Sequence, residues 1–165
     1  MIQELQAEAL AHMHSYVQKM GRIRVLLADD HEVVRRHISN LLQDEPDIQI
    51  VAEAENGEQA LDLARKINPE AILMDVEMSV LNGVEATRIL SREMPHIRVI
   101  ALSMHQEEEW VNAILKAGAV NYLSKCCPFS ELVNALRECR TGFRKRRAVQ
   151  NSTLAANVSA KHLHG

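Results

Sequence analysis

Short apolar runs alternate with segments of helical hydrophobic period between residues 23 and 140. The apolar runs predict five strands, at 23–28, 48–54, 71–74, 98–102 and 120–123. The segments that follow them predict five helices, at 32–43, 58–67, 83–94, 107–117 and 128–140. Such alternation is typical of parallel βαβ units, in which helices cover both faces of one sheet.

Five parallel strands in a segment of this length predict a flavodoxin-like, doubly wound (βα)5 fold of the α/β class, with strand order 2-1-3-4-5. The second strand, at 48–54, alternates polar and apolar residues, which favours a place near the edge of the sheet. In folds of this kind, ligands bind at the carboxyl ends of the strands.

A further helix is predicted over residues 1–20, because no Pro or Gly interrupts the chain before Gly21. Four residues, spaced three, four and three apart, form one apolar stripe on it: Leu10, Met13, Val17 and Met20. The stripe could pair with a second copy of the chain or lie on the domain's own surface. We therefore expect an amphipathic helix (1–20), one globular domain (21–141) and a mobile tail (142–165) that is basic, then polar.

The 165 residues are 47% apolar and 25% charged, a balance typical of a soluble domain with a buried core. No apolar run approaches the roughly 18 residues that span a bilayer, and no secretory signal pattern is present, so we expect a cytoplasmic protein. Three cysteines, Cys126, Cys127 and Cys139, make no disulfide framework. We expect buried or half-buried thiols rather than metal or redox sites.

Charge is unevenly distributed along the chain. Six of the 19 Lys and Arg residues, and no acid, follow residue 139, so residues 1–139 carry a formal charge of −9. An acidic body of this kind is not typical of a nucleic-acid-binding domain. The basic run at 144–147 fits a solvated segment or a helix C-terminus better than a nucleic-acid contact.

Polar side chains follow four of the five predicted strands. Asp29 and Asp30 follow the first, Asp75 the third, Ser103 the fourth and Lys125 the fifth. Because parallel strands end at one edge of a sheet, we expect these five side chains to converge. Taken singly, Asp30 or Ser103 would be an ordinary helix cap and Lys125 a solvated strand end. Together they indicate one site.

Three neighbouring carboxylates raise one another's pKa values unless a cation joins them. Mg²⁺ suits a site of one or two carboxylates with waters and a substrate phosphate. Lys125 and the Ser103 hydroxyl would stand beside the same acids. The set therefore predicts Mg²⁺-dependent phosphoryl transfer to Asp75, in which metal and lysine neutralise the phosphoryl oxygens.

The segment from Ile23 to about Arg140 resembles the receiver domain of two-component response regulators. The motifs that carry this resemblance are VLLADDHEVVR, ILMDVEMSVLNGVEATRIL, VIALSMH and AGAVNYLSKCCPFSEL. Details such as DDH and ALSMH look closest to the branch whose members usually carry a C-terminal LuxR-type helix-turn-helix that binds DNA.

The resemblance implies a role for each residue of the site. Asp75 would accept a phosphoryl group from a phosphohistidine on a sensor histidine kinase or phosphotransfer protein. The implied Mg²⁺ ligands are Asp29, Asp30, Asp75 and the backbone carbonyl of Glu77. The implied phosphate-binding and switching residues are Ser103, Lys125 and Tyr122. Glu77 and His105 occupy positions that tune how fast water removes the phosphate.

The resemblance also implies that a switching face built from residues 107–140 carries dimer or partner contacts. Only about 25 residues follow the receiver-like segment, too few for a helix-turn-helix, so we expect a stand-alone regulator. Ser79 stands where the family usually has proline. We expect Ser79 to touch no ligand and only to loosen its loop slightly.

Three hypotheses follow for the function. The first is a phosphorylatable response regulator, which is no enzyme apart from self-catalysed phosphorylation and dephosphorylation of Asp75. The second is a constitutive, receiver-like interaction module that dimerises through residues 1–20, and the complete set of site residues disfavours it. The third is a small Mg²⁺-dependent phosphohydrolase with an aspartyl nucleophile. Such an enzyme needs a second acid, for which Glu77 is the candidate, and normally a cap over the substrate. No insertion in this sequence is long enough to form a cap.

Overall fold

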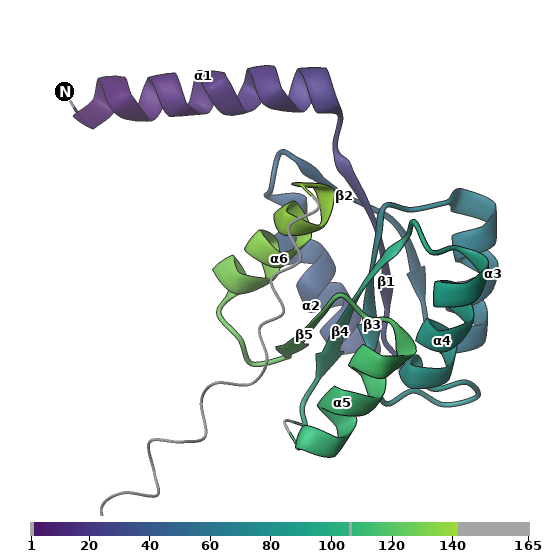
Figure 1. Ribbon diagram of the computed structural model, residues 1–165. Helices are drawn as coiled ribbons and strands as arrows, with labels where there is room; N and C mark the ends of the chain where they lie inside the picture. Colours follow the sequence, from purple (N-terminus) through teal and green to yellow (C-terminus); the bar gives the residue numbers. More distant parts are fainter. Residues whose placement is uncertain (1, 106, 142–165) are drawn as a thin grey trace, which may run out of the picture.

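The computed structural model, which describes residues 2–105 and 107–141, contains one five-stranded parallel sheet between two layers of helices (Figure 1). The strands are β1 (Ile23–Ala28), β2 (Ile48–Ala54), β3 (Ala71–Asp75), β4 (Arg98–Ser103) and β5 (Asn121–Ser124). The helices are α1 (Ile2–Met20), α2 (Glu32–Gln43), α3 (Gly57–Ile67), α4 (Gly83–Glu93), α5 (Glu108–Ala117) and α6 (Phe129–Thr141). The strand order is β2-β1-β3-β4-β5, which confirms the flavodoxin-like fold and places β2 at an edge.

Successive residues of the central strands face opposite layers of the core. Leu26 and Ile72 pack on one side with residues from α3, α4 and α5. Leu27 and Leu73 pack on the other side with residues from α2 and α6, and Figure 1 shows the same division of the helices. All four side chains are buried. Burial on both faces explains why β1 and β3 are almost continuously apolar until their carboxyl ends.

The predicted boundaries agree with the observed ones within one residue for every strand and helix. Two small differences matter for function. Asp75 and Ser103 are the last residues of β3 and β4, not the first residues after them. Each is therefore held by sheet pairing: Asp75 pairs with Leu102, and Ser103 pairs with Ser124.

Helix α1 extends away from the rest of the chain at the amino end of β1 (Figure 1). Ile2 and Leu5 on it are 74% and 64% exposed. Of the predicted stripe only the Leu10 side chain is described, and it is 59% exposed. Residues 142–165 of the predicted tail lie outside the described residues, so the three-part division stays a prediction. No helix in the described part of the chain is long and apolar enough to cross a membrane.

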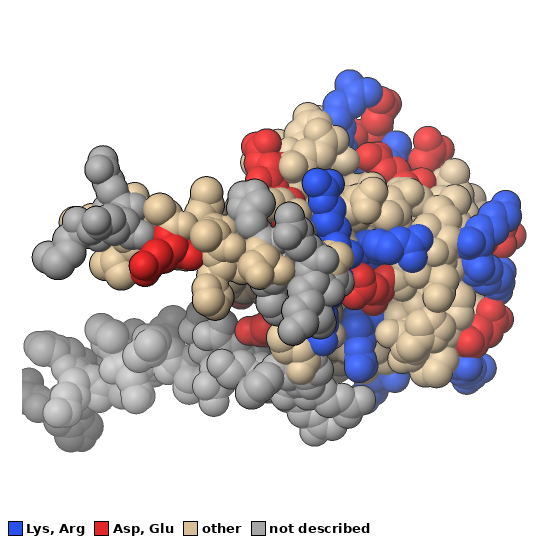
Figure 2. Space-filling model, turned by 90° about the horizontal axis from the view of Figure 1, so that it is seen from above, with Lys and Arg blue, Asp and Glu red and all other residues tan. Residues whose placement is uncertain are grey.

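The amino-terminal edge of the sheet, seen in Figure 2, carries Lys and Arg interspersed with Asp and Glu. The Arg140 guanidinium on α6 pairs there with Glu70, at 2.8 Å from Oε1, and also donates to the Gly21 carbonyl. The described residues of this face thus carry charges of both signs rather than one continuous basic surface. The basic run at 144–147 lies outside the described residues.

A second ion pair ties α6 to the turn before β2. The Arg137 guanidinium lies 2.7 Å from the buried Asp47 carboxylate and 2.8 Å from Glu45. The hydrogen bond from Arg137 holds the pKa of Asp47 below its usual value, although burial opposes the shift. A carboxyl group with a lowered pKa stabilises the fold above its unfolded-state pKa, and this stabilisation is lost as pH falls through the native pKa.

Arg137→Met is expected to lower the free energy of unfolding at pH 7 by about 1–2 kcal/mol, because buried Asp47 loses its partner. The difference from wild type should shrink at pH 3, below the ordinary Asp pKa of about 3.9. Urea denaturation of wild type and variant at both pH values measures this difference in the free energy of unfolding. The control is Arg36→Met, whose exposed pair with Glu32 should contribute almost nothing. An equal loss at pH 7 and pH 3 would contradict the assignment.

Candidate functional site

The acidic residues gather where β1 and β3 end. Asp29 and Asp30 directly follow β1, Asp75 ends β3, and the pairing of Ala28 with Met74 brings these ends side by side. Asp29 and Asp75 are 1% and 3% exposed. Two buried carboxylates on adjacent strand ends require positive charge nearby, because burial and mutual repulsion both disfavour their ionised forms.

Lys125 supplies that charge from the turn after β5. Its Nζ lies 2.7 Å from Asp29 Oδ2 and 3.0 Å from Asp75 Oδ2, and its side chain is only 8% exposed. Burial raises the pKa of Asp75; Lys125 opposes this, and Asp29 adds to it. Burial alone would lower the pKa of Lys125, but the two carboxylates raise it above its ordinary value. Lys125 is therefore held in its charged form between the two acids.

Ser103 and Tyr122 lie on the neighbouring strands. Ser103 is buried at the end of β4, its carbonyl accepts the Lys125 N–H at 2.9 Å, and its Oγ accepts the His105 N–H at 3.0 Å. The Tyr122 hydroxyl on β5 is buried without a hydrogen-bond partner among the described residues. Burial raises the pKa of Tyr122, and the neighbouring Ser103 hydroxyl opposes the shift. The hydroxyls of Ser103 and Tyr122 thus lie close to each other on neighbouring strands.

A cation fits the acidic end of this site. Ligand atoms of Asp29, Asp30, His31 and Asp75 lie within 4.8 Å of one another. Asp29 Oδ2 is buried, and its close partner there is the Lys125 ammonium at 2.7 Å. Carboxylate oxygens are the ligands that Mg²⁺ prefers. The cluster is consistent with the Mg²⁺ site of a receiver.

Residues 25–137 match the family model of the response regulator receiver domain. The chain belongs to this family. The receiver is a module of two-component signal transduction rather than a conventional enzyme, in agreement with the sequence motifs.

Relatives of this receiver include full-length regulators. The transcriptional regulatory protein DegU of Brevibacillus brevis is 40% identical over 122 residues, which are 74% of this chain and 52% of that protein. Response regulator GacA of Pseudomonas protegens is 44% identical over 115 residues, 70% of this chain and 54% of that protein. The chain therefore spans about half the length of the curated relatives it matches.

Solved structures agree with this assignment. The signal receiver domain of the putative response regulator NarL from Mycobacterium tuberculosis aligns with a TM-score of 0.70 at 31% identity, covering 74% of this chain and 98% of that one. A LuxR-family response regulator from Aurantimonas sp. aligns with a TM-score of 0.71 at 31% identity, covering 75% and 89%. The similarity to LuxR-family regulators was predicted from the sequence motifs.

Two loops of the receiver meet through the half-buried residue His105. His105 Nε2 lies 3.0 Å from the Glu77 carboxylate, and His105 Nδ1 lies 3.4 Å from that of Glu107. Glu107, then Glu77, raise the pKa of His105. The two residues predicted to tune dephosphorylation are thus in contact, and their pair bridges the β3–α4 and β4–α5 loops.

Ser79 lies against one of the predicted Mg²⁺-binding residues. Its backbone N–H donates to Asp30 Oδ2 across 3.4 Å, and proline at this position would lack that donor. The sequence showed that a donor was gained, but only the conformation of the β3–α4 loop shows that Asp30 accepts it.

Arg35 was missed by the sequence analysis. It is 7% exposed on α2, its Nη1 donates to the Asp29 carbonyl at 2.7 Å, and its Nε donates to Glu53 on β2 at 3.1 Å. The signal was available, because Arg35 falls on the same helical stripe as the buried residues Ile38 and Leu42. Arg35 fixes the backbone that presents Asp29 and Asp30.

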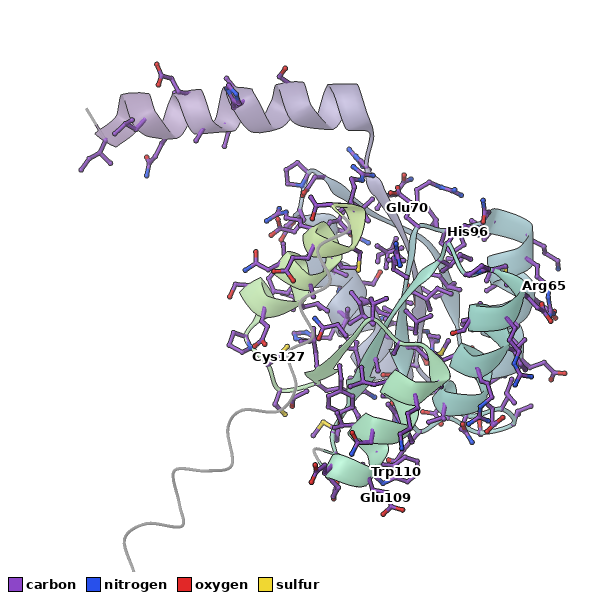
Figure 3. All side chains as sticks on the ribbon, in the orientation of Figure 1. Arg65, Glu70, His96, Glu109, Trp110 and Cys127 are labelled. Atoms are coloured by element: carbon purple, nitrogen blue, oxygen red, sulfur yellow. The ribbon has the colours of Figure 1, made fainter. Side chains whose placement is uncertain are left out.

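The cysteines are free, as predicted. Cys127, in the β5–α6 loop (Figure 3), and Cys139 are half-buried, and burial raises the pKa of Cys139 to about 11. Cys126 is exposed, contrary to the expectation of burial. No group of metal-ligating side chains within the described ranges includes a cysteine.

One hollow in the described part of the chain lies away from the acidic cluster. It measures about 320 Å³ and runs along the outer edge of β2, between Ser39 and Gln43 of α2 and residues 48–53. We place the functional site at the acidic cluster instead, because only there do buried charges converge on groups able to bind phosphate and metal.

Val80, in the β3–α4 loop, has a φ of 67°, a left-handed conformation that β-branched residues rarely adopt. Such a residue costs roughly 1–2 kcal/mol, and glycine would remove this cost while adding about 0.5–1 kcal/mol of unfolded-state entropy. Val80 is 77% exposed, so little packing is lost. Val80→Gly is therefore expected to raise the free energy of unfolding by about 0.5–1 kcal/mol in urea titrations.

The control for Val80→Gly is Val33→Gly in α2, an equally exposed valine with ordinary helical geometry. That substitution should lower the stability, since glycine is a poor helix former. Destabilisation of both variants would show that Val80 is not strained.

Proposed function

We propose that this receiver accepts a phosphoryl group on Asp75 in a Mg²⁺-dependent reaction, and that the donor is a phosphohistidine of a sensor histidine kinase or phosphotransfer protein. The observation that carries the proposal is the placement of Asp75. Its carboxylate is buried at a strand end, with Oδ2 3.0 Å from Lys125 Nζ and Oδ1 accepting the Glu77 N–H at 3.3 Å.

The carboxylate is thus oriented for attack on a phosphorus atom. An Asp75 oxygen forms the new P–O bond while the P–N bond of the donor breaks and its imidazole nitrogen keeps the electron pair. Lys125 turns one of its contacts to a phosphoryl oxygen, which keeps the lysine charge paired. Mg²⁺, held by Asp29, Asp30, Asp75 and the Glu77 carbonyl, would offset the remaining negative charge.

Ser103 and Tyr122 then change position in response to the new phosphoryl charge. The Ser103 hydroxyl, which now accepts from His105, can donate to a phosphoryl oxygen if the β4–α5 loop moves toward Asp75. The buried Tyr122 hydroxyl, which lies beside Ser103, then moves into the space that Ser103 leaves. Glu77 and His105 tune the rate at which water hydrolyses the acyl phosphate on Asp75. The output face is α5, β5 and α6, within residues 107–140.

We propose dimerisation or partner binding, rather than nucleic-acid contact, as the output of the described residues. Either the face at 107–140 or the amphipathic helix 1–20 carries the dimer contact, the second on the strength of exposed Ile2 and Leu5. Regulation without a DNA-binding domain stays a prediction, because the chain spans about half the length of its curated relatives.

The test is incubation of the full chain with Mg²⁺ and acetyl phosphate, followed by peptide mass spectrometry. We expect modification of Asp75 with Mg²⁺ and none with excess chelator. An unmodified wild-type chain would overturn the proposal in favour of a constitutive module, and turnover of p-nitrophenyl phosphate would indicate the phosphohydrolase. Light scattering with and without beryllofluoride then measures dimerisation. An unchanged size would rule out dimerisation as the switched output.

A further inference from the structure

His31, the residue after the acid pair, has no part in the proposed function so far. It precedes α2, and its side chain is 69% exposed. Its Nδ1 nevertheless lies 2.9 Å from Asp30 Oδ1 and 3.4 Å from Asp29 Oδ1. The imidazole therefore lies against the acidic cluster instead of extending into solvent.

The backbone explains this orientation. His31 is the N-cap residue of α2, with extended geometry (φ −92°, ψ 104°), but its side chain makes no capping hydrogen bond. Its own N–H donates to Asp29 Oδ1 at 2.8 Å. This bond anchors the residue to the acidic loop, and the ring lies with its Nδ1 against Asp30.

The four donor groups lie close enough together for small side-chain movements to bring them onto one ion. In octahedral coordination with metal–ligand bonds of about 2.1 Å, neighbouring ligands lie roughly 3.0 Å apart and opposite ones roughly 4.2 Å apart. Ligand atoms of Asp29, Asp30, His31 and Asp75 all lie within 4.8 Å of one another. Asp29 Oδ2 is buried and has the Lys125 ammonium at 2.7 Å as its partner. Three carboxylates and Lys125 leave a formal charge of −2, which a divalent cation neutralises.

We propose that His31 contributes a nitrogen ligand to the cation at Asp29, Asp30 and Asp75, so that this receiver favours Mn²⁺ and later first-row ions over Mg²⁺. The inference rests on the cation site of the proposed function. Mg²⁺ gains little from imidazole because it prefers oxygen ligands. Mn²⁺, Co²⁺ and Ni²⁺ bind mixed nitrogen and oxygen sites with affinities that rise in this order.

Pulsed electron paramagnetic resonance of Mn²⁺ bound to the full chain tests the proposal directly. A coordinated imidazole gives a ¹⁴N hyperfine coupling, whereas a histidine that only hydrogen-bonds to Asp30 does not give the coupling of a bound ligand. We expect the coupling in wild type and its loss in His31→Asn. The same substitution should weaken Ni²⁺ binding roughly tenfold or more, and Mg²⁺ binding by less than about threefold, in calorimetric titrations.

The matched control is His37→Asn, because His37 is an exposed histidine on α2 that contributes no atom to the cluster. It should retain both the coupling and the affinities. Two results would overturn the role of His31 alone. One is Mn²⁺ binding that depends on Asp75 but gives no nitrogen coupling, and the other is a coupling that survives in His31→Asn. Failure of both Mn²⁺ and Mg²⁺ to bind would overturn the cation site itself, and the role of His31 with it.

Discussion

An Asp75→Asn chain is expected to take up no phosphoryl group from acetyl phosphate under conditions that modify the wild-type chain. Asparagine keeps the shape of the side chain but replaces the attacking oxygen with a weakly nucleophilic amide. Loss of a nucleophile typically lowers a rate by more than about a thousandfold. Intact-protein mass spectrometry over a time course measures the loss.

The environment of Asp75 makes this loss specific. Asp29 is equally buried and also contacts Lys125, so it is the obvious substitute acceptor. Its Oδ1, however, already accepts the His31 N–H, and its carbonyl is fixed by Arg35. Asp75 is the carboxylate whose other oxygen has only a long backbone contact, 3.3 Å from the Glu77 nitrogen.

Asp62→Asn is the control for the chemistry, since Asp62 is an exposed acid on α3 that pairs with Arg65. This variant should be phosphorylated at the wild-type rate. Phosphorylation of Asp75→Asn at a comparable rate would show that another carboxylate, with Asp29 the first candidate, is the acceptor.

Convergence at the sheet edge could be predicted because it follows from topology alone. Asp29, Asp75 and Lys125 lie far apart in the sequence, yet each is the last residue of a strand or directly follows one, and a parallel sheet brings such ends together. The structure places Lys125 within 3.0 Å of both acids. The roles assigned to these residues remain predictions for experiment.

Contacts that depend on loop conformation could not be predicted in the same way. The Ser79 N–H reaches Asp30 only because the β3–α4 loop folds back past the acid pair, with Val80 in a left-handed conformation. His31 lies on the acids because the backbone before α2 is extended there. Periodicity determines which face of a helix or strand is buried, but it contains no information on the path of a loop.

The remaining large effect concerns the glycine that follows this loop. Gly83 begins α4 after the N-cap Asn82, and its N–H donates to the Val76 carbonyl at 3.0 Å. A Cβ on Gly83 would lie 2.0 Å from the Asp75 carbonyl oxygen and 3.0 Å from the Val76 Cα. Both contacts involve backbone atoms of β3 and its exit, which have no rotamer to change. Any side chain at position 83 must therefore displace the strand end that carries Asp75.

Gly83→Ala is expected to lower the free energy of unfolding by about 3 kcal/mol or more, the upper range for overpacking, because backbone rather than side chain must move. Phosphorylation of the molecules that remain folded should also slow, since the Asp75 carboxylate moves with its backbone. Gly21→Ala is the control, because it introduces backbone strain without the steric conflict expected for Gly83→Ala. Gly21 has a φ of 71° but open space around it, so alanine there should cost only about 1–2 kcal/mol and leave phosphorylation unchanged. Equal losses of stability in the two variants, with normal phosphorylation in both, would show that Gly83 does not hold Asp75 in place.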